Sequence, residues 1–256
     1  MANGNFVWFD LTASDPEAAK RFYPEIVGWK PTRWPESDYE LWNAGEVGVG
    51  GIAKEDPRGA GRPPFWLGYA AVENVDASVT RAQKLGGKVI QPGRDIPSVG
   101  RWAVLSDPQG AVFATFQPEP KKEAPRLEGP GIFGWAELNT TDWKSAWKFY
   151  SELLGWTPTR SMSMGPELGD YFMFGLNGKD SIGGMSNTAA MMKAPAHWLY
   201  YVAVKNVDDA AKRVSEKGGK ILSGPMDIPS EEGGRIAQCA DPQGAMFALM
   251  SVPRST

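Results

Sequence analysis

The chain has 256 residues and a formal net charge of −3, and its 42% hydrophobic and 22% charged residues are typical of a globular protein. No apolar run approaches the roughly 18 residues of a membrane helix, and no block of Lys or Arg indicates a nucleic-acid surface. The single cysteine, Cys239, excludes an internal disulfide and suits a reducing compartment. The N-terminal residues show no signal-peptide pattern, so we expect a cytoplasmic protein that binds neither nucleic acid nor a membrane.

The main feature of the sequence is an internal repeat. Matching segments recur in the same order in both halves, and their separation changes only slightly along the chain, which places short insertions in loops. The matched pairs include Asp15 with Asp142, Phe22-Tyr23 with Phe149-Tyr150, Gly50-Gly51 with Gly183-Gly184, Trp66 with Trp198, Asn74–Asp76 with Asn206–Asp208, and Asp107–Ala111 with Asp241–Ala245. We expect domains over residues 1–117 and 132–256, joined by a linker rich in Pro, Glu and Lys over 118–131.

The first elements in chain order are a strand and a helix. Alternating hydrophobicity predicts a strand over Phe6–Thr12. Asp15 is suited to cap a helix that has Pro16 at its first position and ends at Gly28. Pro24 lies inside this pattern, so we expect a kink or break there.

The remaining pattern predicts a second unit of the same kind in each half. The expected elements of the first half are strands over Tyr39–Ala44, Val47–Ala53 and Trp66–Val72, a helix from Asp76 to the Gly86-Gly87 pair, and strands near Val89, over Arg101–Ser106 and over Val112–Gln117. The second half repeats this order. Each half therefore contains two βαβββ units, and the chain contains four.

These segments resemble the vicinal-oxygen-chelate superfamily of glyoxalases, bleomycin-resistance proteins and dioxygenases. The resemblance rests on SDPEAAKRFY…GW, VENVD and DPQGAVF in the first half and on TDWKSAWKFY…GW, VKNVD and DPQGAMF in the second. It is strong to a two-domain branch that includes a mycobacterial glyoxalase-like antigen described as a hydroxylase. The resemblance implies an α+β fold with two glyoxalase-like domains, whose curved mixed sheets surround cavities. It does not decide function, because the superfamily holds lyases, dioxygenases, isomerases and metal-free drug-binding proteins.

The superfamily's metal is held mostly by His, Gln and Glu from the first, fourth, fifth and eighth strands. The resemblance places these positions on Trp8 and Trp135 in the first strand, Leu67 and Leu199 in the fifth, and Ala114 and Ala248 in the eighth. The fourth strand, near the Gly-Gly pairs, offers no carboxylate. Trp, Leu and Ala side chains do not bind divalent metals, so we expect no metal and no cofactor.

A carboxylate follows each of these tryptophans by two positions, at Asp10 and Glu137. Residues two apart share one face of a strand, so each carboxylate is expected beside its tryptophan. Buried carboxylates need partners, and Arg101 and Arg235, which match between the halves, could supply one. Two interpretations stay open: a general base or ligand-binding group, and a structural salt bridge or hydrogen bond.

Several aromatic residues are further candidates for ligand binding. The hydroxyl groups of Tyr69 and Tyr201, which match between the halves, could orient a ligand, or these residues could be rim or core tyrosines. Trp8 and Trp135 could stack on a planar ligand or fill the core. Trp66 and Trp198 point to the opposite strand face and are expected in the core beneath helices.

Two reactive residue types are expected to be bystanders. His197, the one histidine, has Phe65 at its matching position and no His or Cys partner in the sequence pattern. Cys239 matches Leu105 and is expected to be a small buried apolar residue.

Three functional hypotheses follow from the sequence. The first is a metal-independent protein that binds a small, planar or aromatic molecule. The second is a lyase, isomerase or hydroxylase that uses Asp10 and Glu137 or an unconventional metal. The third is an interaction protein with vestigial cavities. The expected partner is a small-molecule ligand, and the chain is expected to be a monomer or a homodimer.

Overall fold

The computed structural model describes residues 4–35, 37–53, 56–59, 61–119, 127–166, 169–228 and 233–251. Part of the expected linker over 118–131, namely residues 120–126, lies outside the described residues. The first half contains β1 (Phe6–Thr12), α1 (Pro16–Val27), β2 (Lys30–Arg33), β3 (Glu40–Ala44), β4 (Val47–Ala53), β5 (Phe65–Ala71), α2 (Val75–Lys84), β6 (Lys88–Ile96), β7 (Gly100–Ser106) and β8 (Val112–Pro118).

The second half repeats this order with one additional short helix. It contains β9 (Phe133–Asn139), α3 (Trp143–Leu154), β10 (Thr157–Ser163), β11 (Asp170–Gly175), β12 (Ser181–Ser186), α4 (Thr188–Met192), β13 (His197–Ala203), α5 (Val207–Glu216), β14 (Lys220–Asp227), β15 (Arg235–Ala240) and β16 (Met246–Ser251). The prediction of four βαβββ units is confirmed.

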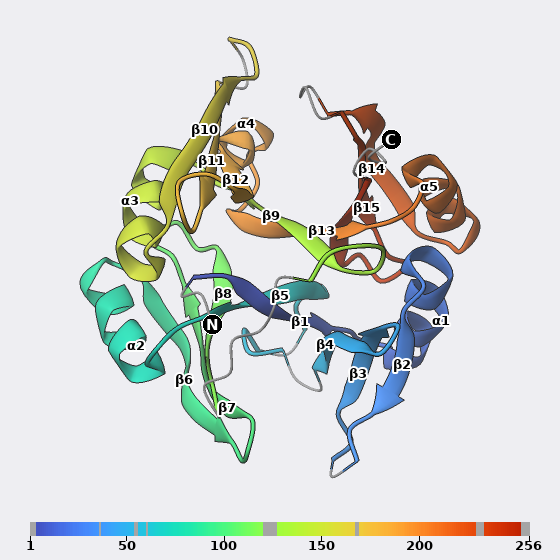
Figure 1. Cartoon of the computed structure of the whole chain (residues 1–256), viewed down its shortest axis with the longest axis horizontal. Helices are drawn as coiled ribbons and strands as arrows, with labels where there is room; N and C mark the ends of the chain where they lie inside the picture. The colour runs from blue at the N-terminus through green and yellow to red at the C-terminus, as the bar shows by residue number, and fades with distance from the viewer. Residues whose placement is uncertain are drawn as a thin grey trace. The chain divides into compact units, whose positions relative to one another are not determined.

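The strands form two curved, open, eight-stranded sheets of mixed direction, one from each half (Figure 1). The first sheet has the order β2-β3-β4-β1-β5-β8-β7-β6, and the second has the matching order β10-β11-β12-β9-β13-β16-β15-β14. Within each βαβββ unit the first strand runs parallel to the last strand, as β1 does to β4, and the other neighbouring strands are antiparallel. The predicted α+β class with curved mixed sheets is therefore confirmed.

Helix α1 begins and ends where the sequence predicted, but Pro24 does not break it. The side chain of Asp15 accepts a hydrogen bond from the Ala18 N–H at 3.0 Å. Gly28 has a φ of 78° and donates its N–H to the carbonyl oxygen of Pro24 at 3.0 Å. The expected break is wrong because Pro24 lies in the last turn, where one lost hydrogen bond is outweighed by burial of residues such as Ile26.

The sequence pattern missed three short elements. Every residue of β2 is exposed, and much of β10 is exposed as well, so neither strand shows the alternation of buried and polar residues that identifies a strand. Helix α4 has five residues and lies in the connection between β12 and β13, where the first half has no helix among its described residues. Among the described residues, every helix is too short or too polar to span a lipid bilayer.

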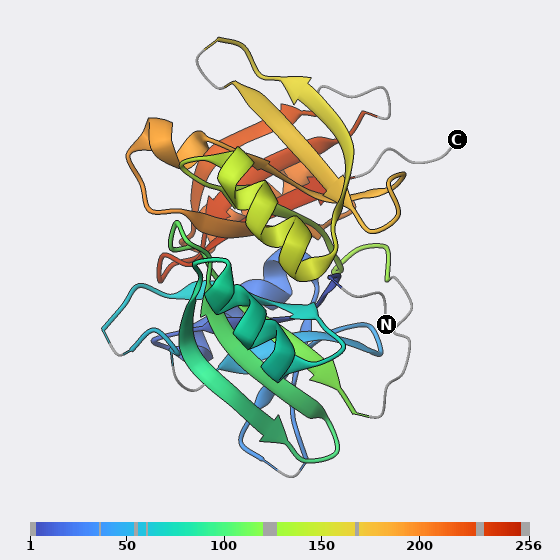
Figure 2. The same cartoon turned by 90° about the vertical axis from the view of Figure 1, so that its left-hand side faces the viewer.

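The helices cover one face of the strands that follow them. Helix α2 packs on β6, β7 and β8, and Figure 2 shows it lying across β6 and β7. Helix α5 packs in the same way on β14, β15 and β16. The predicted core positions of Trp66 and Trp198 are confirmed, since these residues are 3% and 6% exposed.

By its contacts the chain divides into two compact units, each of which draws segments from both halves of the sequence. One unit consists of Met1–Trp8, Leu67–Pro125 and Trp135–Trp198, and the other consists of Phe9–Trp66, Arg126–Gly134 and Leu199–Thr256.

A buried aspartate joins the two halves inside each unit. In one unit the Asp107 side chain accepts hydrogen bonds from the backbone N–H groups of Gln109 and Ala111, both at 2.9 Å, and from the Tyr150 hydroxyl at 3.3 Å. The Tyr150 hydroxyl in turn accepts the indole N–H of Trp198 at 3.1 Å. The D-P-Q-G-A motif therefore forms a turn that bonds to a helix of the other half.

The second compact unit repeats this arrangement with Asp241. Its side chain accepts the Tyr23 hydroxyl at 3.1 Å, and Tyr23 accepts the indole N–H of Trp66 at 3.0 Å. The glutamine of the same motif, Gln243, exchanges two hydrogen bonds with the backbone of Asp15, at 2.6 and 2.9 Å. The turn thus also fixes the residue that caps α1.

Burial raises the pKa of both aspartates. Desolvation is the largest cause for Asp107 and for Asp241, and the hydrogen bonds from backbone N–H groups and from a tyrosine partly oppose it. The pKa of Tyr23 is raised well above its ordinary value, first by burial and then by the charge of Asp241. Asp107, Asp241 and Tyr23 therefore hold their protons more strongly in the folded chain than in the unfolded chain.

We expect Tyr23→Phe and Tyr150→Phe each to lower the free energy of unfolding by about 1–3 kcal/mol, because each leaves a buried carboxylate without one donor. Urea unfolding, followed by circular dichroism, measures this change. Thr80→Val removes an exposed hydroxyl that is bonded to a backbone carbonyl oxygen, and it serves as the control for the general effect of losing a hydroxyl group. Equal stability of Tyr23→Phe and the wild type would contradict the assigned role of Asp241.

The raised pKa values also predict a pH dependence. A carboxyl with a raised pKa in the folded state stabilises the fold fully below its unfolded pKa, and this contribution is lost as the pH rises through the folded pKa. The Asp107→Asn, Asp241→Asn double variant should therefore lose less stability than the wild type as the pH rises from the acidic range toward neutrality. Urea unfolding over that pH range tests this, and parallel curves for the two proteins would refute it.

Candidate functional site

The second half contains a chain of hydrogen bonds around Glu137. Trp135, Glu137 and Asn139 alternate along β9, so their side chains share one face. Tyr171 on β11 donates its hydroxyl to Glu137 Oε2 at 3.1 Å, and the Asn139 amide donates to Oε1 at 3.2 Å. The Trp135 indole N–H donates to the Tyr171 hydroxyl at 2.8 Å. Glu137 is only 9% exposed.

The first half contains the matching pair. Asp10 is 6% exposed on β1, two residues after Trp8, and it accepts the hydroxyl of Tyr39. Asp10–Tyr39 and Glu137–Tyr171 are the carboxylate–tyrosine pairs. Each pair lies within a single compact unit. Because one pair has Asp and the other Glu, the feature shared by the halves is a carboxylate bonded to a tyrosine.

A glycine of each Gly-Gly motif makes room for the tyrosine. Gly51 on β4 lies opposite Asp10, and Gly184 on β12 lies opposite Glu137. A Cβ atom at Gly51 would overlap the Tyr39 hydroxyl, and one at Gly184 would overlap the Tyr171 ring. Both glycines are therefore required by the close approach of the tyrosine, in backbone conformations that other residues also adopt.

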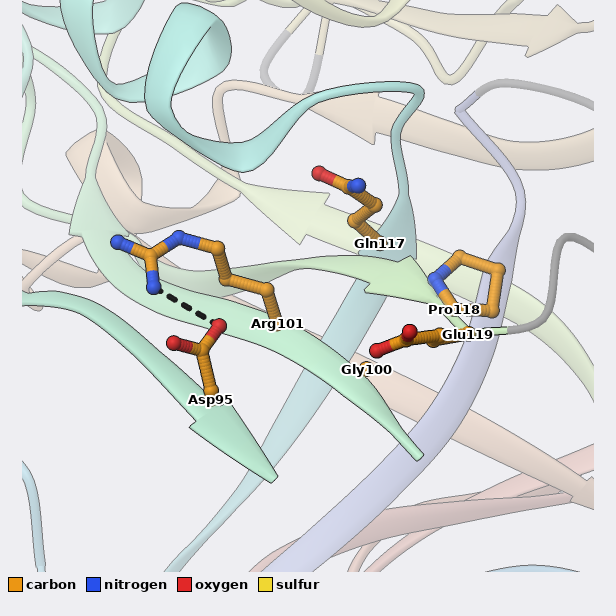
Figure 3. Close-up of a pocket in the computed structure, with 6 residues that line it drawn as sticks. All are labelled: Asp95, Gly100, Arg101, Gln117, Pro118 and Glu119. Atoms are coloured by element: carbon orange, nitrogen blue, oxygen red, sulfur yellow. Dashed lines mark hydrogen bonds and ion pairs between the residues drawn. The ribbon is translucent and has the colours of Figure 1, made fainter. Parts of the chain in front are cut away.

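Arg101 bonds to aspartates rather than to the first-strand carboxylates. The sequence suggested Arg101 as a partner of Asp10, and this expectation is corrected, because the partner is Tyr39. The guanidinium of Arg101 lies 3.0 Å from Asp76 and 2.9 Å from Asp95. Figure 3 shows Arg101 turned toward Asp95 beside a surface hollow of about 290 Å³, which Gln117 and Glu119 also line. The hydrogen bonds that Arg101 donates to Asp76 and Asp95 raise the pKa of Arg101.

Arg235 repeats this pairing in the second half. It lies 2.8 Å from Asp208 and 2.7 Å from Asp227, whose hydrogen bonds raise its pKa. In both halves the arginine therefore ties the first turn of a helix to an edge strand. The partial exposure of these pairs limits their contribution to stability.

The matched tyrosines of the fifth strands are buried in different surroundings. Tyr69 is 7% exposed, and its ring lies 5.9 Å from that of Trp102. Tyr201 is 3% exposed, and its hydroxyl accepts a hydrogen bond from the Gln238 amide at 3.1 Å. The halves thus keep the tyrosine and change its neighbour.

The remaining candidates divide into partly exposed and buried groups. Trp8 and Trp135 are partly exposed, as ligand stacking requires. His197 is partly exposed, and its Nδ1 lies 2.9 Å from the carbonyl oxygen of Pro195. Cys239 is fully buried, which confirms the predicted core role, and burial raises the pKa of its thiol to about 12. The thiol is therefore protonated and unreactive at neutral pH.

The side chains present do not fit the divalent metal of the fold. Within the described part of the chain, no three His, Cys, Asp or Glu side chains gather where they could hold a metal ion. The positions that the family resemblance assigns to ligands in β5 and β8 are taken by Leu67 and Ala114, which are 1% and 0% exposed. These hydrocarbon side chains offer no lone pair to a metal.

Comparisons with known proteins agree with the fold. The CFP32 protein of Mycobacterium tuberculosis, named as a suggested glyoxylase, is 34% identical over 248 residues that cover 95% of this chain and 93% of that protein. The anthracycline biosynthesis protein DnrV of Streptomyces peucetius is 29% identical over 267 residues, covering 98% of this chain and 94% of that protein.

Solved structures of the same fold include a metal-bound glyoxalase and a dioxygenase. The Mn(II)-bound glyoxalase of Novosphingobium aromaticivorans has a TM-score of 0.65 at 18% identity, over 98% of this chain and 82% of that one. The dioxygenase LapB of Pseudomonas sp. KL28 has a TM-score of 0.67 at 13% identity, over 100% of this chain and 96% of that one. The family model matches twice, at residues 5–115 and 132–249, and the chain therefore belongs to the Glyoxalase/Bleomycin resistance protein/Dioxygenase superfamily.

Proposed function

We propose that the chain binds a small planar molecule with hydroxyl groups at its carboxylate–tyrosine pairs, without the divalent metal of the superfamily. The observation that carries this proposal is the recurrence of one arrangement in both halves. In each half a buried carboxylate on the first strand accepts a tyrosine hydroxyl, and a glycine opposite it makes room for that tyrosine. Carboxylate oxygens accept several hydrogen bonds, so they can also receive ligand hydroxyl groups.

The neighbouring tryptophans support a flat ligand. Trp135 precedes Glu137 by two residues on the same strand and within the same compact unit, and it is partly exposed, as Trp8 is in the first half. A ring stacked on an indole places its hydroxyl groups at the plane's edge, where a carboxylate can accept them. The name of DnrV connects that relative with anthracyclines, which are planar, hydroxylated polycyclic molecules.

Quenching of tryptophan fluorescence by a dihydroxyanthraquinone tests this proposal. We expect saturable quenching in the presence of EDTA, with free tryptophan amide as the control for absorption by the probe. In the Asp10→Asn, Glu137→Gln double variant the Kd should rise about tenfold, since loss of charge-assisted hydrogen bonds costs about 1.4 kcal/mol or more.

Glu216→Gln is the matched control, because it removes an exposed carboxylate from α5, which packs on β14, β15 and β16, and it should leave the Kd unchanged. The Kd of the Tyr39→Phe, Tyr171→Phe double variant is a second test of the same pairs, because this variant removes the tyrosine hydroxyl groups and keeps both carboxylates. An unchanged Kd in the carboxylate variant, or loss of wild-type binding in EDTA, would reject the proposal.

The chain from Trp135 through Tyr171 to Glu137 favours a second candidate function, acid–base catalysis. A tyrosine hydroxyl bonded to a carboxylate provides a proton donor beside a proton acceptor, as lyases and isomerases require. If Glu137 is a general base, the protein should speed the exchange of the C–H hydrogens of dihydroxyacetone in D₂O. Glu137→Gln should abolish this exchange, which NMR measures, and exchange at the buffer rate with wild-type protein would exclude this role for that ketone.

A further inference from the structure

The buried tyrosine that bonds to Asp241 lies among tryptophan rings. The Tyr23 ring has three tryptophan neighbours, with ring centroids 5.3, 5.7 and 5.7 Å away: Trp66, Trp29 and Trp42. Trp29 also lies 5.6 Å from Trp66 and 5.7 Å from Trp42. All four rings are at most 3% exposed and belong to one compact unit. Indole and phenol side chains are among the most easily oxidised groups of a protein, so an electron can move between these neighbouring rings.

The hydroxyl of Tyr23 donates its hydrogen bond to a base. The acceptor is Oδ2 of Asp241 at 3.1 Å, and Asp241 is 3% exposed. A phenol that loses an electron becomes a strong acid, so its proton moves to a carboxylate at this distance. Burial raises the pKa of Asp241, which makes this carboxylate a better proton acceptor. Oxidation of Tyr23 therefore ends in a neutral radical beside a neutral carboxylic acid, and the buried negative charge disappears.

The hydrogen bonds of the neighbouring tryptophans involve weaker bases. The indole N–H of Trp29 donates to the carbonyl oxygen of Gly131 at 2.6 Å, and that of Trp66 donates to the Tyr23 hydroxyl at 3.0 Å. Trp42 Nε1 is buried and has no hydrogen-bond partner among the described residues. Amide and phenol oxygens accept a full proton poorly, so an oxidised indole here keeps its proton and its positive charge. A charge in the core is costly, so the electron vacancy moves on to Tyr23.

The other compact unit repeats this arrangement around Tyr150. Its hydroxyl donates to Asp107 at 3.3 Å, and Asp107 is 1% exposed. Two tryptophan rings lie 5.3 Å from the Tyr150 ring, namely Trp156 and Trp198. The indole N–H of Trp156 donates to the carbonyl oxygen of Gly4, which is again a weak base. A tyrosine bonded to a carboxylate and surrounded by tryptophans is therefore common to both units.

One ring differs between the two units. Trp42 pairs in register with Gly50, and Phe174 pairs with the matching Gly183, so Phe174 takes the position of Trp42. Phenylalanine is much harder to oxidise than tryptophan, so the second unit has one electron donor fewer. Because that core forms with Phe174, the indole of Trp42 is not required for folding.

We propose that Tyr23 and Tyr150 are redox-active tyrosines that trap the electron vacancy left by a one-electron oxidant acting at the protein surface. The oxidant takes one electron from a tryptophan and is itself reduced. The tyrosine then gives an electron to the oxidised indole and its proton to the aspartate, which leaves a tyrosyl radical and a carboxylic acid. A one-electron reductant such as ascorbate restores the tyrosine when the proton returns. This role uses no residue of the carboxylate–tyrosine pairs, so it stands independently of the function proposed above.

Pulse radiolysis with the azidyl radical tests this role, because this small oxidant takes an electron from tryptophan and becomes azide. Trp34 is 38% exposed in the compact unit of Tyr23 and is accessible to it. In the wild type, the absorbance of tryptophanyl radicals should decay while that of a long-lived tyrosyl radical rises. The rise should slow in D₂O, because the phenolic proton moves in the same step. An equal rate in H₂O and D₂O would contradict the proton transfer.

Matched variants locate the radical. The Tyr23→Phe, Tyr150→Phe double variant should lose the long-lived tyrosyl signal. The Asp107→Asn, Asp241→Asn double variant should lose it too, because an amide oxygen still accepts the hydroxyl hydrogen bond but does not take up the proton. In a Tyr150→Phe background, Trp42→Phe installs the residue of the other unit and keeps the Tyr23 bond. It should lower the tyrosyl yield, since one of three neighbouring indoles is removed. Circular dichroism shows that each variant is folded.

The Tyr39→Phe, Tyr171→Phe double variant is the control, because it keeps both buried aspartate–tyrosine bonds and should retain the signal. Loss of the signal in this variant would move the radical to the carboxylate–tyrosine pairs and overturn the assignment. A wild type that forms no long-lived tyrosyl radical would overturn it as well, and so would an undiminished signal in the folded Tyr23→Phe, Tyr150→Phe variant.

Discussion

The hydrogen bond between a buried aspartate and a tyrosine of the other half holds each compact unit together. Asp107 and Asp241 start tight turns, and each turn bonds backbone N–H groups to one carboxylate oxygen and a tyrosine hydroxyl to the other. A carboxylate that is 1–3% exposed is costly unless nearly all its acceptor sites are used. The turn therefore forms fully only when a strand end of one half meets a helix of the other half.

This constraint also positions the first strands. In one unit Gln109 of the turn exchanges hydrogen bonds with the backbone of Asp142, at 2.7 and 2.9 Å, and so fixes the start of α3 directly after β9. Strand β9 carries Trp135 and Glu137. The geometry of that carboxylate–tyrosine pair thus depends on a turn that lies in the other half of the sequence. The duplicated D-P-Q-G-A motif is structural, and the neighbouring strand provides the chemical groups.

The sequence predicted the order of the elements well because local chemistry determines it. Asp15 and Asp142 cap helices, Gly28 and Gly155 end them, and both carry out these roles in the structure. Asp10 and Glu137 were found because a carboxylate recurs on the first strand. Their partners, Tyr39 and Tyr171, were not found, because strand register determines which residues meet. In addition, the spacing from the tyrosine to the facing glycine differs by one residue between the halves, so the two tyrosines do not align. The arginines were assigned to the wrong carboxylates for the same reason, since their partners lie on a helix and an edge strand.

Duplication within one chain explains why some features are constant and others have diverged. The aspartate of each turn, the tyrosine that donates to it and the tryptophan that donates to the tyrosine are the same in both compact units. Changing one of them leaves a buried polar group without a partner. Partly exposed positions of the sheets carry no such constraint, and there Trp102 and Phe116 correspond to Ile236 and Met250. A position that must only remain compatible with the strand can change from aromatic to aliphatic. One fold can therefore present two chemically different surfaces, with the energetic demand of folding confined to the turns.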